Sequence, residues 1–176
     1  MVDASLQVAV DAAAQGLIHA ATQRLPILVC GNGGSAADAQ HIAGELAGRF
    51  LLERPAIDVR ALSADTALLT ALGNDYGYET IFARQVQAHG RAGGVLLAIS
   101  TSGKSRNVLL AAETARKQKM MVIGLTGEGG GPLAALSDVV LAVPSKSTPL
   151  VQQGHQVIYH YLCAVTELAM ANLSND

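Results

Sequence analysis

The sequence GVLLAIS at residues 94–100 is followed directly by TSGKS at residues 101–105. A short apolar run that ends in Ser, Thr and Gly is typical of a strand buried on both faces of a sheet. From about Ser105 to Lys117 the apolar residues recur at helical spacing. Strand, loop and helix in this order form the unit from which parallel sheets are built. This stretch therefore predicts an α/β fold.

The same order recurs on both sides of this unit. Further strands are predicted at residues 27–30, 57–62, 120–125 and 139–143, and helices at 4–22, 35–47, 66–72, 78–89 and 149–172, with a turn at 73–77 and a glycine-rich connection at 127–131. Because strands and helices alternate, we expect a doubly wound, five-stranded parallel sheet flanked by helices, which is a flavodoxin-like three-layer sandwich. A single domain over residues 1–176 is expected, with the helix at 4–22 at its start.

The composition fits such a core and bears on which partners the protein binds. Half of the residues are hydrophobic and only 15% are charged. The formal net charge of -2, with Lys and Arg scattered along the chain, gives little support to nucleic-acid binding. A mean hydropathy of +0.31 is high for a soluble monomer, so we expect apolar helix surface to be covered by another subunit.

The compartment is predicted from the cysteines and from the apolar segments. Cys30 and Cys163 lie in apolar runs without CxxC spacing, which suits buried thiols in a reducing compartment. No apolar segment has the length of a membrane span or the pattern of a secretory leader. We expect a cytoplasmic protein that does not contact a membrane.

Two loops of small polar residues follow predicted strands. In parallel sheets ligands bind beyond the carboxyl ends of the strands. The hydroxyls of Ser100, Thr101, Ser102 and Ser105, with the amides at the start of the next helix, predict a phosphate site. Helix capping is the simpler alternative, but one hydroxyl would suffice for a cap. The other loop, GNGGS at 31–35, lacks the G-x-G-x-x-G spacing of dinucleotide sites and could be only a structural turn.

Polar residues also interrupt two predicted helices. His41 and Glu45 are four apart and share one helix face, while Gln152 and His160 stand on the last helix, about 12 Å apart along its axis. A solvated, salt-bridged face is the simplest interpretation of the first pair. Taken together, His41, Glu45 and His160 could instead supply a base, an acid and a site for a metal such as zinc. Spacing alone does not choose between these roles.

Four motifs in this order resemble one family. They are CGNGGS at 30–35, H-x-x-x-E-L-x-G-R at 41–49, GND at 73–75 and STSGxS at 100–105. The chain is similar to the SIS-domain phosphoheptose isomerases, which convert sedoheptulose 7-phosphate to D-glycero-D-manno-heptose 7-phosphate for the heptose of the bacterial lipopolysaccharide core. STSGxS alone is shared by the wider sugar-phosphate-binding SIS class, whereas the His/Glu helix and the Gln152 and His160 pair narrow the resemblance to the isomerases.

The resemblance implies roles for individual residues. Glu45 would act as the base and His160 as the acid. Zinc would be held by His41, Glu45, Gln152 and His160, and would compete with the use of Glu45 as a base. The family also implies a homotetramer with active sites near subunit boundaries. The implied substrate-binding residues are Asn32, Gly33, Gly34, Ser35, Glu45, Arg49, Asn74, Asp75, Ser100, Thr101, Ser102, Ser105 and Gln152.

Two other functions compete with this one. A related SIS protein that binds the bacterial replication initiator shares the run at residues 31–43, but it lacks acidic and histidine residues at the positions of Glu45 and His160. An isomerase of another sugar phosphate, such as a hexulose 6-phosphate, would use the same loops with a different pocket wall. Because this chain has both residues, we expect an enzyme, since function is read from the site and not from the fold.

Overall fold

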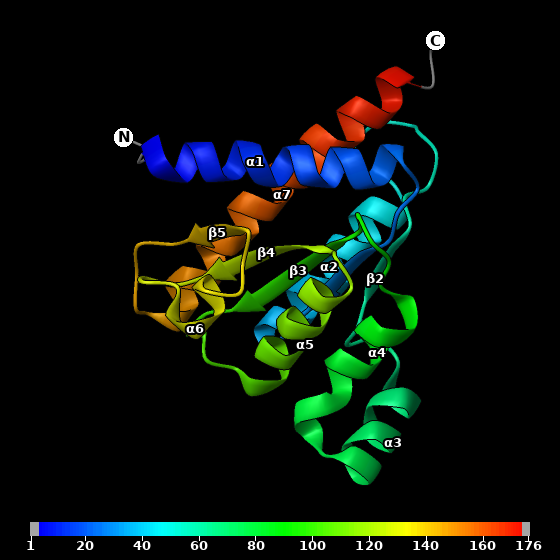
Figure 1. Ribbon diagram of the computed structural model, residues 1–176. Helices are drawn as coiled ribbons and strands as arrows, with labels where there is room; N and C mark the ends of the chain where they lie inside the picture. Colours follow the sequence, from blue (N-terminus) through cyan, green and yellow to red (C-terminus); the bar gives the residue numbers. More distant parts are fainter. Residues whose placement is uncertain (1–3, 174–176) are drawn as a thin grey trace.

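A five-stranded parallel sheet forms the centre of the protein. The structure, a computed structural model, describes residues 4–173. Its strands are β1 (Ile27–Cys30), β2 (Val59–Ala61), β3 (Val95–Ser100), β4 (Met121–Thr126) and β5 (Val139–Ala142). They are ordered β2-β1-β3-β4-β5, and every residue of the central strand β3 is buried. The doubly wound sheet predicted from the sequence is confirmed (Figure 1).

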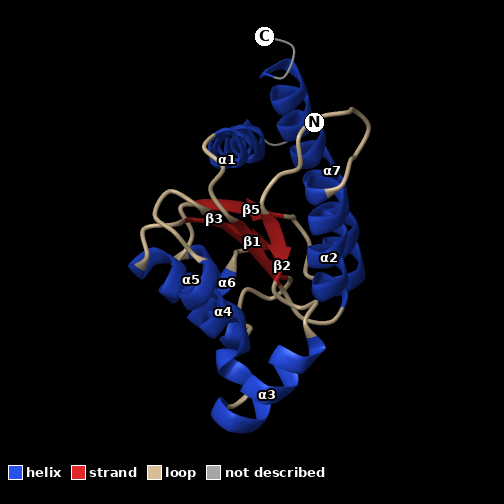
Figure 2. Ribbon diagram, turned by 90° about the vertical axis from the view of Figure 1, so that its right-hand side faces the viewer, coloured by secondary structure: helices blue, strands red, loops and turns tan. Residues whose placement is uncertain are grey.

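Helices cover both faces of the sheet. The helices are α1 (Ala4–Thr22), α2 (Gly34–Ala47), α3 (Thr66–Tyr76), α4 (Ile81–His89), α5 (Arg106–Lys117), α6 (Gly131–Ala134) and α7 (Thr148–Leu173), and the 3-10 turn η1 is Tyr78–Thr80. Figure 2 shows the sheet between the two helical layers. Because side chains alternate along a strand, Val29 joins the core beneath α1, α2 and α7, while Leu28 and Cys30 join the core beneath α3 to α6.

One predicted turn is wrong. Residues 73–76 continue α3 as helix, and the chain turns only at Gly77, which ends the helix with a φ of 85°. That positive φ is accessible to glycine at little cost, so Gly77 and not Gly73 is the stop signal. The helix begins where Asp65 accepts a hydrogen bond from the Leu68 amide at 2.9 Å. The short helix α6, which begins at Gly131 where the predicted glycine-rich connection ends, was not predicted.

The long helix α7 runs alongside α2. It spans 26 residues and packs on α2 and α1, as Figure 1 shows. Near their starts the Gln152 side chain lies against Gly34, and further along the Tyr159 hydroxyl contacts His41. The two helices are therefore parallel. Within residues 4–173 no helix combines the length and the apolar character that crossing a bilayer requires.

A buried ion pair holds the segment that follows α2. Glu167 of α7 accepts hydrogen bonds from the amides of Phe50, Leu51 and Leu52 at 2.6–2.8 Å. Its partner Arg54 lies 3.5 Å away, and both side chains are at most 1% exposed. Burial favours the protonated acid, but the three amides and the guanidinium outweigh it and lower the pKa of Glu167.

Glu167→Gln tests this ion pair. It should lower the free energy of unfolding by about 3–5 kcal/mol, because it leaves a buried guanidinium without its counter-charge. Urea denaturation at neutral pH and fixed protein concentration measures the change. Since the folded-state pKa is lowered, the stabilisation is present above the ordinary glutamate pKa and is lost as pH falls through the folded-state value. The unfolding free energies of wild type and Glu167→Gln should therefore become equal in acid.

The matched control is Glu113→Gln. Glu113 pairs with Arg106 at 3.9 Å, and both side chains are well exposed. Removing this charge should change stability by about 1 kcal/mol or less. Equal unfolding free energies for wild type and E167Q at neutral pH would show that the buried pair does not stabilise the fold.

Candidate active site

The two polar loops meet where the strand order reverses. β1 and β3 are neighbours in the sheet, and the chain leaves them toward opposite edges. Such a switch point is the usual ligand site of an open α/β sheet. Asn32 of the first loop and Asn107 of α5 exchange two side-chain hydrogen bonds, both of 2.9 Å. The loop after β1 and the helix after β3 are thus joined directly.

The serine loop after β3 has the geometry of an anion site. The hydroxyls of Ser100 and Ser105 lie 3.0 Å apart, and Ser102 accepts a hydrogen bond from the Lys104 amide at 3.2 Å. Ser105 stands at the N-cap of α5, yet its side chain makes no capping hydrogen bond. The capping alternative is therefore wrong for Ser105. The amide groups at the start of α5 and the nearby hydroxyls can serve a bound anion.

The serine loop rests closely on a second loop. Gly103 has a φ of 64°, and a side chain there would collide with the carbonyl of Gly130. Gly127 donates its amide to Thr101 O at 3.0 Å. Beside this contact lies a hollow of about 400 Å³ that Thr101, Ser102, Lys104, Glu128, Gly129, Gly131, Ser145 and Lys146 line. Lys104 places positive charge next to the serine loop, whereas Lys146 is paired with Glu128 of the same hollow at 3.6 Å.

Three donors converge between α2 and α7. His41 Nε2 lies 3.0 Å from Glu45 Oε1 and 3.4 Å from His160 Nε2. One donor atom from each of the three residues lies within 4.8 Å of the others. Phe50 stacks on the His160 ring with centroids 5.8 Å apart. Two imidazole nitrogens and a carboxylate oxygen suit a borderline cation such as zinc, so these side chains fit a metal ion.

Other predicted site residues lie at different places. Ser35 is buried at the start of α2, beside the exposed Gly33 and Gly34. A side chain at Gly34 would collide with the amide of Gln152. Gly34 precedes His41 by seven residues, about 10 Å along the helix. This chain alone therefore does not bring Gln152 to the three donors, and its metal role stays a prediction.

Three more predicted residues are exposed. Arg49 follows the end of α2, and Asn74 and Asp75 lie on α3, where Asn74 donates a hydrogen bond to Asp75 at 2.8 Å. Within the described part of the chain, none of the three is hydrogen-bonded to the serine loop or to the histidines. Their predicted contacts with substrate remain predictions.

Sequence reasoning missed several members of the site. Asn107 is 3% exposed and holds Asn32, while the Tyr78 hydroxyl donates to the same Asn32 oxygen at 2.9 Å. Tyr159 is buried against His41 and Asp38. The available signals were a polar residue in the first turn after the serine loop and an aromatic residue adjoining His160. Neither signal distinguishes a site residue from an ordinary packed side chain.

Near Tyr159, the half-buried Asp38 and the buried His155 each have one buried atom without a hydrogen-bond partner in the described chain. Asp38 Oδ2 and His155 Nδ1 are buried without a hydrogen bond among the described residues. Burial raises the pKa of Asp38, which the hydrogen bond from Tyr159 and the nearby His155 and His41 oppose. Burial likewise lowers the pKa of His155, although Nε2 lies 3.0 Å from Thr126 O. Burial also raises the pKa of Tyr159 to about 12, so the hydroxyl keeps its proton.

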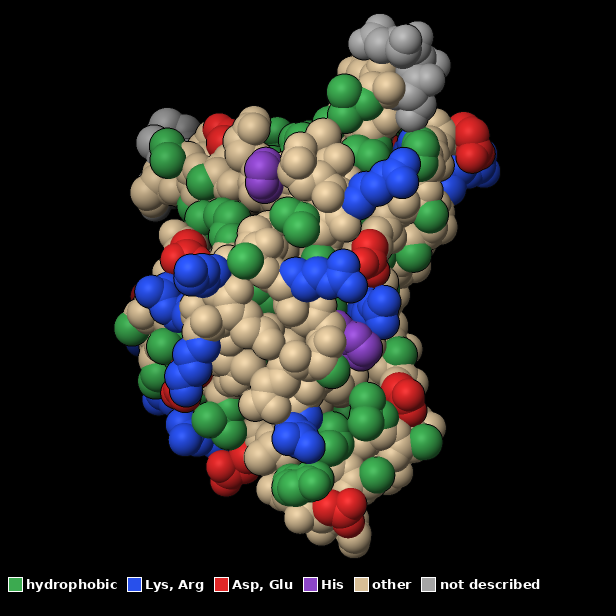
Figure 3. All heavy atoms as spheres, turned by 45° about the vertical axis from the view of Figure 1, so that its right-hand side comes forward, with side chains coloured by type: hydrophobic (Ala, Val, Ile, Leu, Met, Phe, Trp, Pro, Cys, Tyr) green, Lys and Arg blue, Asp and Glu red, His purple; other side chains and the backbone are tan. Residues whose placement is uncertain are grey.

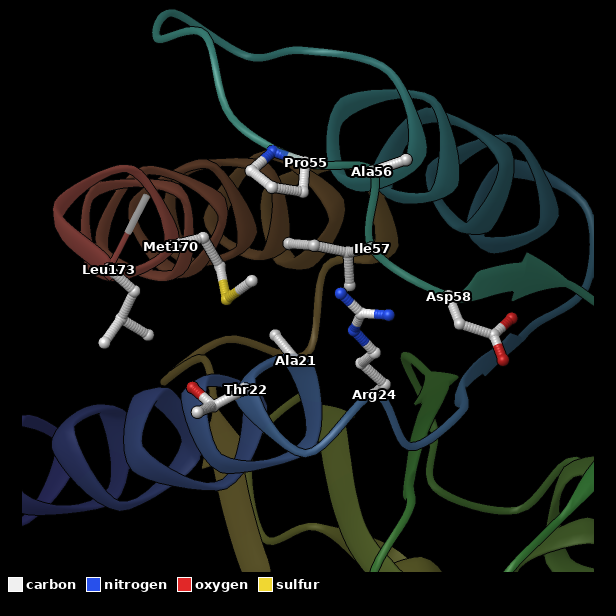
Figure 4. Close-up of a pocket in the computed structure, with 9 residues that line it drawn as sticks. All are labelled: Ala21, Thr22, Arg24, Pro55, Ala56, Ile57, Asp58, Met170 and Leu173. Atoms are coloured by element: carbon white, nitrogen blue, oxygen red, sulfur yellow. The ribbon is translucent and has the colours of Figure 1, made fainter. Parts of the chain in front are cut away.

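A larger hollow lies elsewhere. It measures about 480 Å³ and is lined by Ala21, Thr22, Arg24, Pro55, Ala56, Ile57, Asp58, Met170 and Leu173 (Figure 4). Asp58 directly precedes β2, so this hollow adjoins the amino end of that strand, away from the edge where ligands of such sheets bind. On the face drawn in Figure 3, Lys and Arg side chains are spread out, with acidic side chains between them.

Comparison with known proteins agrees with this geometry. The sequence pattern described as the SIS domain matches residues 2–127, so fold and sequence together define an SIS-domain protein. A phosphoheptose isomerase from Rhodospirillum rubrum is 52% identical over 146 residues, which are 83% of this chain and 78% of that protein.

Solved structures give the same result over more of the chain. The phosphoheptose isomerase of Francisella tularensis superimposes with a TM-score of 0.89 at 40% identity, covering 94% of this chain and 88% of that one. The enzyme of Neisseria gonorrhoeae gives 0.86 at 44% identity, covering 92% and 86%. The chain belongs to the phosphoheptose isomerase family.

Replacing Asn107 tests the link between the two loops. Asn107→Ala should cost about 1–3 kcal/mol of unfolding free energy, because it removes a buried hydrogen-bonding partner of Asn32. Tyr78→Phe removes a hydrogen bond to the same residue from an exposed hydroxyl, which water can replace, so it should cost about 0.5 kcal/mol or less. Urea denaturation of both variants measures the difference. Equal losses would show that burial of Asn107 is not what makes the link stabilising.

Proposed function

We propose that the chain catalyses the aldose-ketose isomerisation of sedoheptulose 7-phosphate to D-glycero-D-manno-heptose 7-phosphate, in heptose synthesis for the lipopolysaccharide core. Membership of the phosphoheptose isomerase family supports this reaction. The observation that carries the proposal is the meeting of Glu45 and His160, from α2 and α7, with donor atoms within 4.8 Å.

Isomerisation requires two proton transfers at adjacent atoms. A base removes the proton from the carbon beside the carbonyl, and an acid protonates the oxygen of the resulting enediol. Glu45 is the proposed base and His160 the proposed acid. Their separation allows both to reach the same pair of substrate atoms. Phe50, stacked on His160, restricts the orientation of the imidazole ring.

The serine loop is the proposed phosphate site. The hydroxyls of Ser100, Thr101, Ser102 and Ser105 and the amides at the start of α5 provide donors for a dianion. Lys104 lines the adjoining hollow and adds favourable charge. Asn32, held by Asn107, is proposed to contact the sugar from the neighbouring loop.

Zinc is the proposed cofactor. His41, Glu45 and His160 would hold it, with Gln152 as a further predicted ligand. When bound, zinc would polarise the substrate carbonyl and stabilise the negative charge that develops on its oxygen. A carboxylate committed to a cation is a weaker base, so the roles of Glu45 as ligand and as base compete.

We also propose a homotetramer with active sites near the subunit boundaries. Val8 on α1 and Val157, Tyr161 and Leu168 on α7 are large apolar side chains with 45–73% of their surface exposed. Burying them against another subunit would remove that surface from water. A cytoplasmic setting is supported by Cys30 and Cys163, which are both free and buried thiols.

Turnover of sedoheptulose 7-phosphate by the pure protein tests the function. Glu45→Gln and His160→Ala should each lower kcat by about 10²–10⁴-fold, because each removes one proton-transfer group. Glu79→Gln is the matched control, since Glu79 is exposed and its one ion pair among residues 4–173 is with the exposed Arg106. Loss of activity with a chelator and recovery on adding zinc would support the metal.

Three results would contradict parts of the proposal. A wild-type protein without turnover that instead binds the replication initiator would sink the isomerase function. Unchanged rates in both variants would show that the acid and base are assigned wrongly. Full activity after complete removal of metal would eliminate zinc while leaving the proton-transfer roles intact.

A further inference from the structure

Tyr159 connects the His41 ring to the half-buried carboxylate of Asp38. Its side chain is 1% exposed, and its hydroxyl lies 3.0 Å from His41 Nδ1 and 3.3 Å from Asp38 Oδ1. The ring also makes edge contacts with His41 and His160, with centroids 5.5 and 4.8 Å apart. This tyrosine therefore touches two of the three proposed metal ligands without being a ligand itself.

When His41 binds a cation, its proton can lie on only one of the two ring nitrogens. A cation occupies the lone pair of Nε2, the nitrogen that faces Glu45 and His160. The neutral ring then carries its proton on Nδ1. That proton needs an acceptor, and the Tyr159 oxygen lies at hydrogen-bond distance. The hydroxyl can accept it because its own proton is donated to Asp38.

We propose that Tyr159 is a positioning residue for metal binding. Its hydroxyl accepts from His41 Nδ1 and donates to Asp38, which fixes the tautomer and orientation of the ring so that Nε2 points at the other donors. Metal-binding histidines commonly donate their second N–H to a carboxylate, carbonyl or water. Here the carboxylate of Asp38 does not contact the imidazole through a hydrogen bond, because the Tyr159 hydroxyl lies between the two.

The surroundings of the hydroxyl support this role. Tyr159 comes from α7 and both of its partners come from α2, one turn apart on the same face. The second oxygen of Asp38 is buried without a hydrogen-bond partner in the described chain. The hydrogen bond from Tyr159 is therefore the one side-chain contact among the described residues that holds this carboxylate. The inference rests on the metal site of the proposed function.

The test measures zinc affinity and not turnover. Metal-free wild type, Tyr159→Phe and Tyr76→Phe are titrated with zinc in competition with a chromophoric chelator. Tyr159→Phe keeps the ring and removes only the hydroxyl, so it should raise the zinc Kd by about 10–100-fold. Tyr76→Phe removes the hydroxyl of an exposed tyrosine at the end of α3 and should leave the Kd unchanged. Melting temperatures of the metal-free proteins show whether each variant is folded.

A double-mutant cycle makes the test specific for the relay. Asp38→Asn should also raise the Kd, because it weakens the acceptor of the Tyr159 proton. The part of this loss that passes through the Tyr159 hydroxyl should vanish in the Tyr159→Phe background, and only the direct charge interaction between Asp38 and His41 should remain. The variant carrying both changes should therefore lose less zinc affinity than the sum of the two single losses. Additive losses would mean that the two residues act independently, and would overturn the relay.

The outcomes separate this inference from the proposed function. Saturable zinc binding by wild type with an equal Kd for Tyr159→Phe would overturn the positioning role and leave the metal site standing. Absence of zinc binding by wild type, or binding unaffected by His41→Ala, would remove the metal site and this inference with it. The isomerase assay would still decide the proton-transfer roles of Glu45 and His160.

Discussion

The pairing of β1 with β3 is the constraint on which the site depends. Their register aligns Ile27 with Val95 and Cys30 with Ala98, so both strands end at the same edge of the sheet. The short loop after β1 and the serine loop after β3 must then lie side by side, because parallel strands carry their carboxyl ends together. Shifting this register by one residue would turn the buried side chains of a strand to the opposite face.

The parallel packing of α2 and α7 brings the proposed proton-transfer residues together. Both helices lie on the same face of the sheet and advance in the same direction. Residues that are about 120 positions apart in the sequence therefore meet in order along the pair, first Gly34 with Gln152, then His41 with His160, and lastly Phe50 with Glu167. The binding loops and the proton-transfer groups thus depend on different pairings of elements.

Much of the fold could be predicted from local patterns. The apolar runs at 27–30 and 95–100 gave strands at almost the observed limits, because a strand buried on both faces has a continuous apolar sequence. The end of α3 was predicted wrongly, because both Gly73 and Gly77 could end a helix. Only the backbone dihedral angles show that Gly77 does so. The strand order β2-β1-β3-β4-β5 is the one typical of flavodoxin-like sheets, but no single residue of the sequence specifies it.

The site was predictable only in part. His41 and Glu45 share a helix face by spacing, and His160 was grouped with them as a polar residue that interrupts an apolar helix, before the family resemblance assigned roles to the three. Asn107 and Tyr159 could not be found in this way, because their importance depends on partners 75 and 118 residues away. The position of Gln152 against Gly34 likewise depends on how far α7 slides along α2, which sequence spacing does not specify.

Arg54 contacts both a buried structural residue and the backbone of a proposed catalytic residue, which matters for protein engineering. Its guanidinium pairs with Glu167 and also donates to the carbonyl oxygen of Glu45 at 2.7 Å. The segment after α2 is thus tied to the backbone of a proposed catalytic residue, and it cannot be shortened or exchanged as an independent surface loop. The exposed residues Thr66 and Ala67 at the start of α3 carry no such tie among the described residues and precede the predicted substrate residues Asn74 and Asp75, so they offer a more separable place for stabilising substitutions.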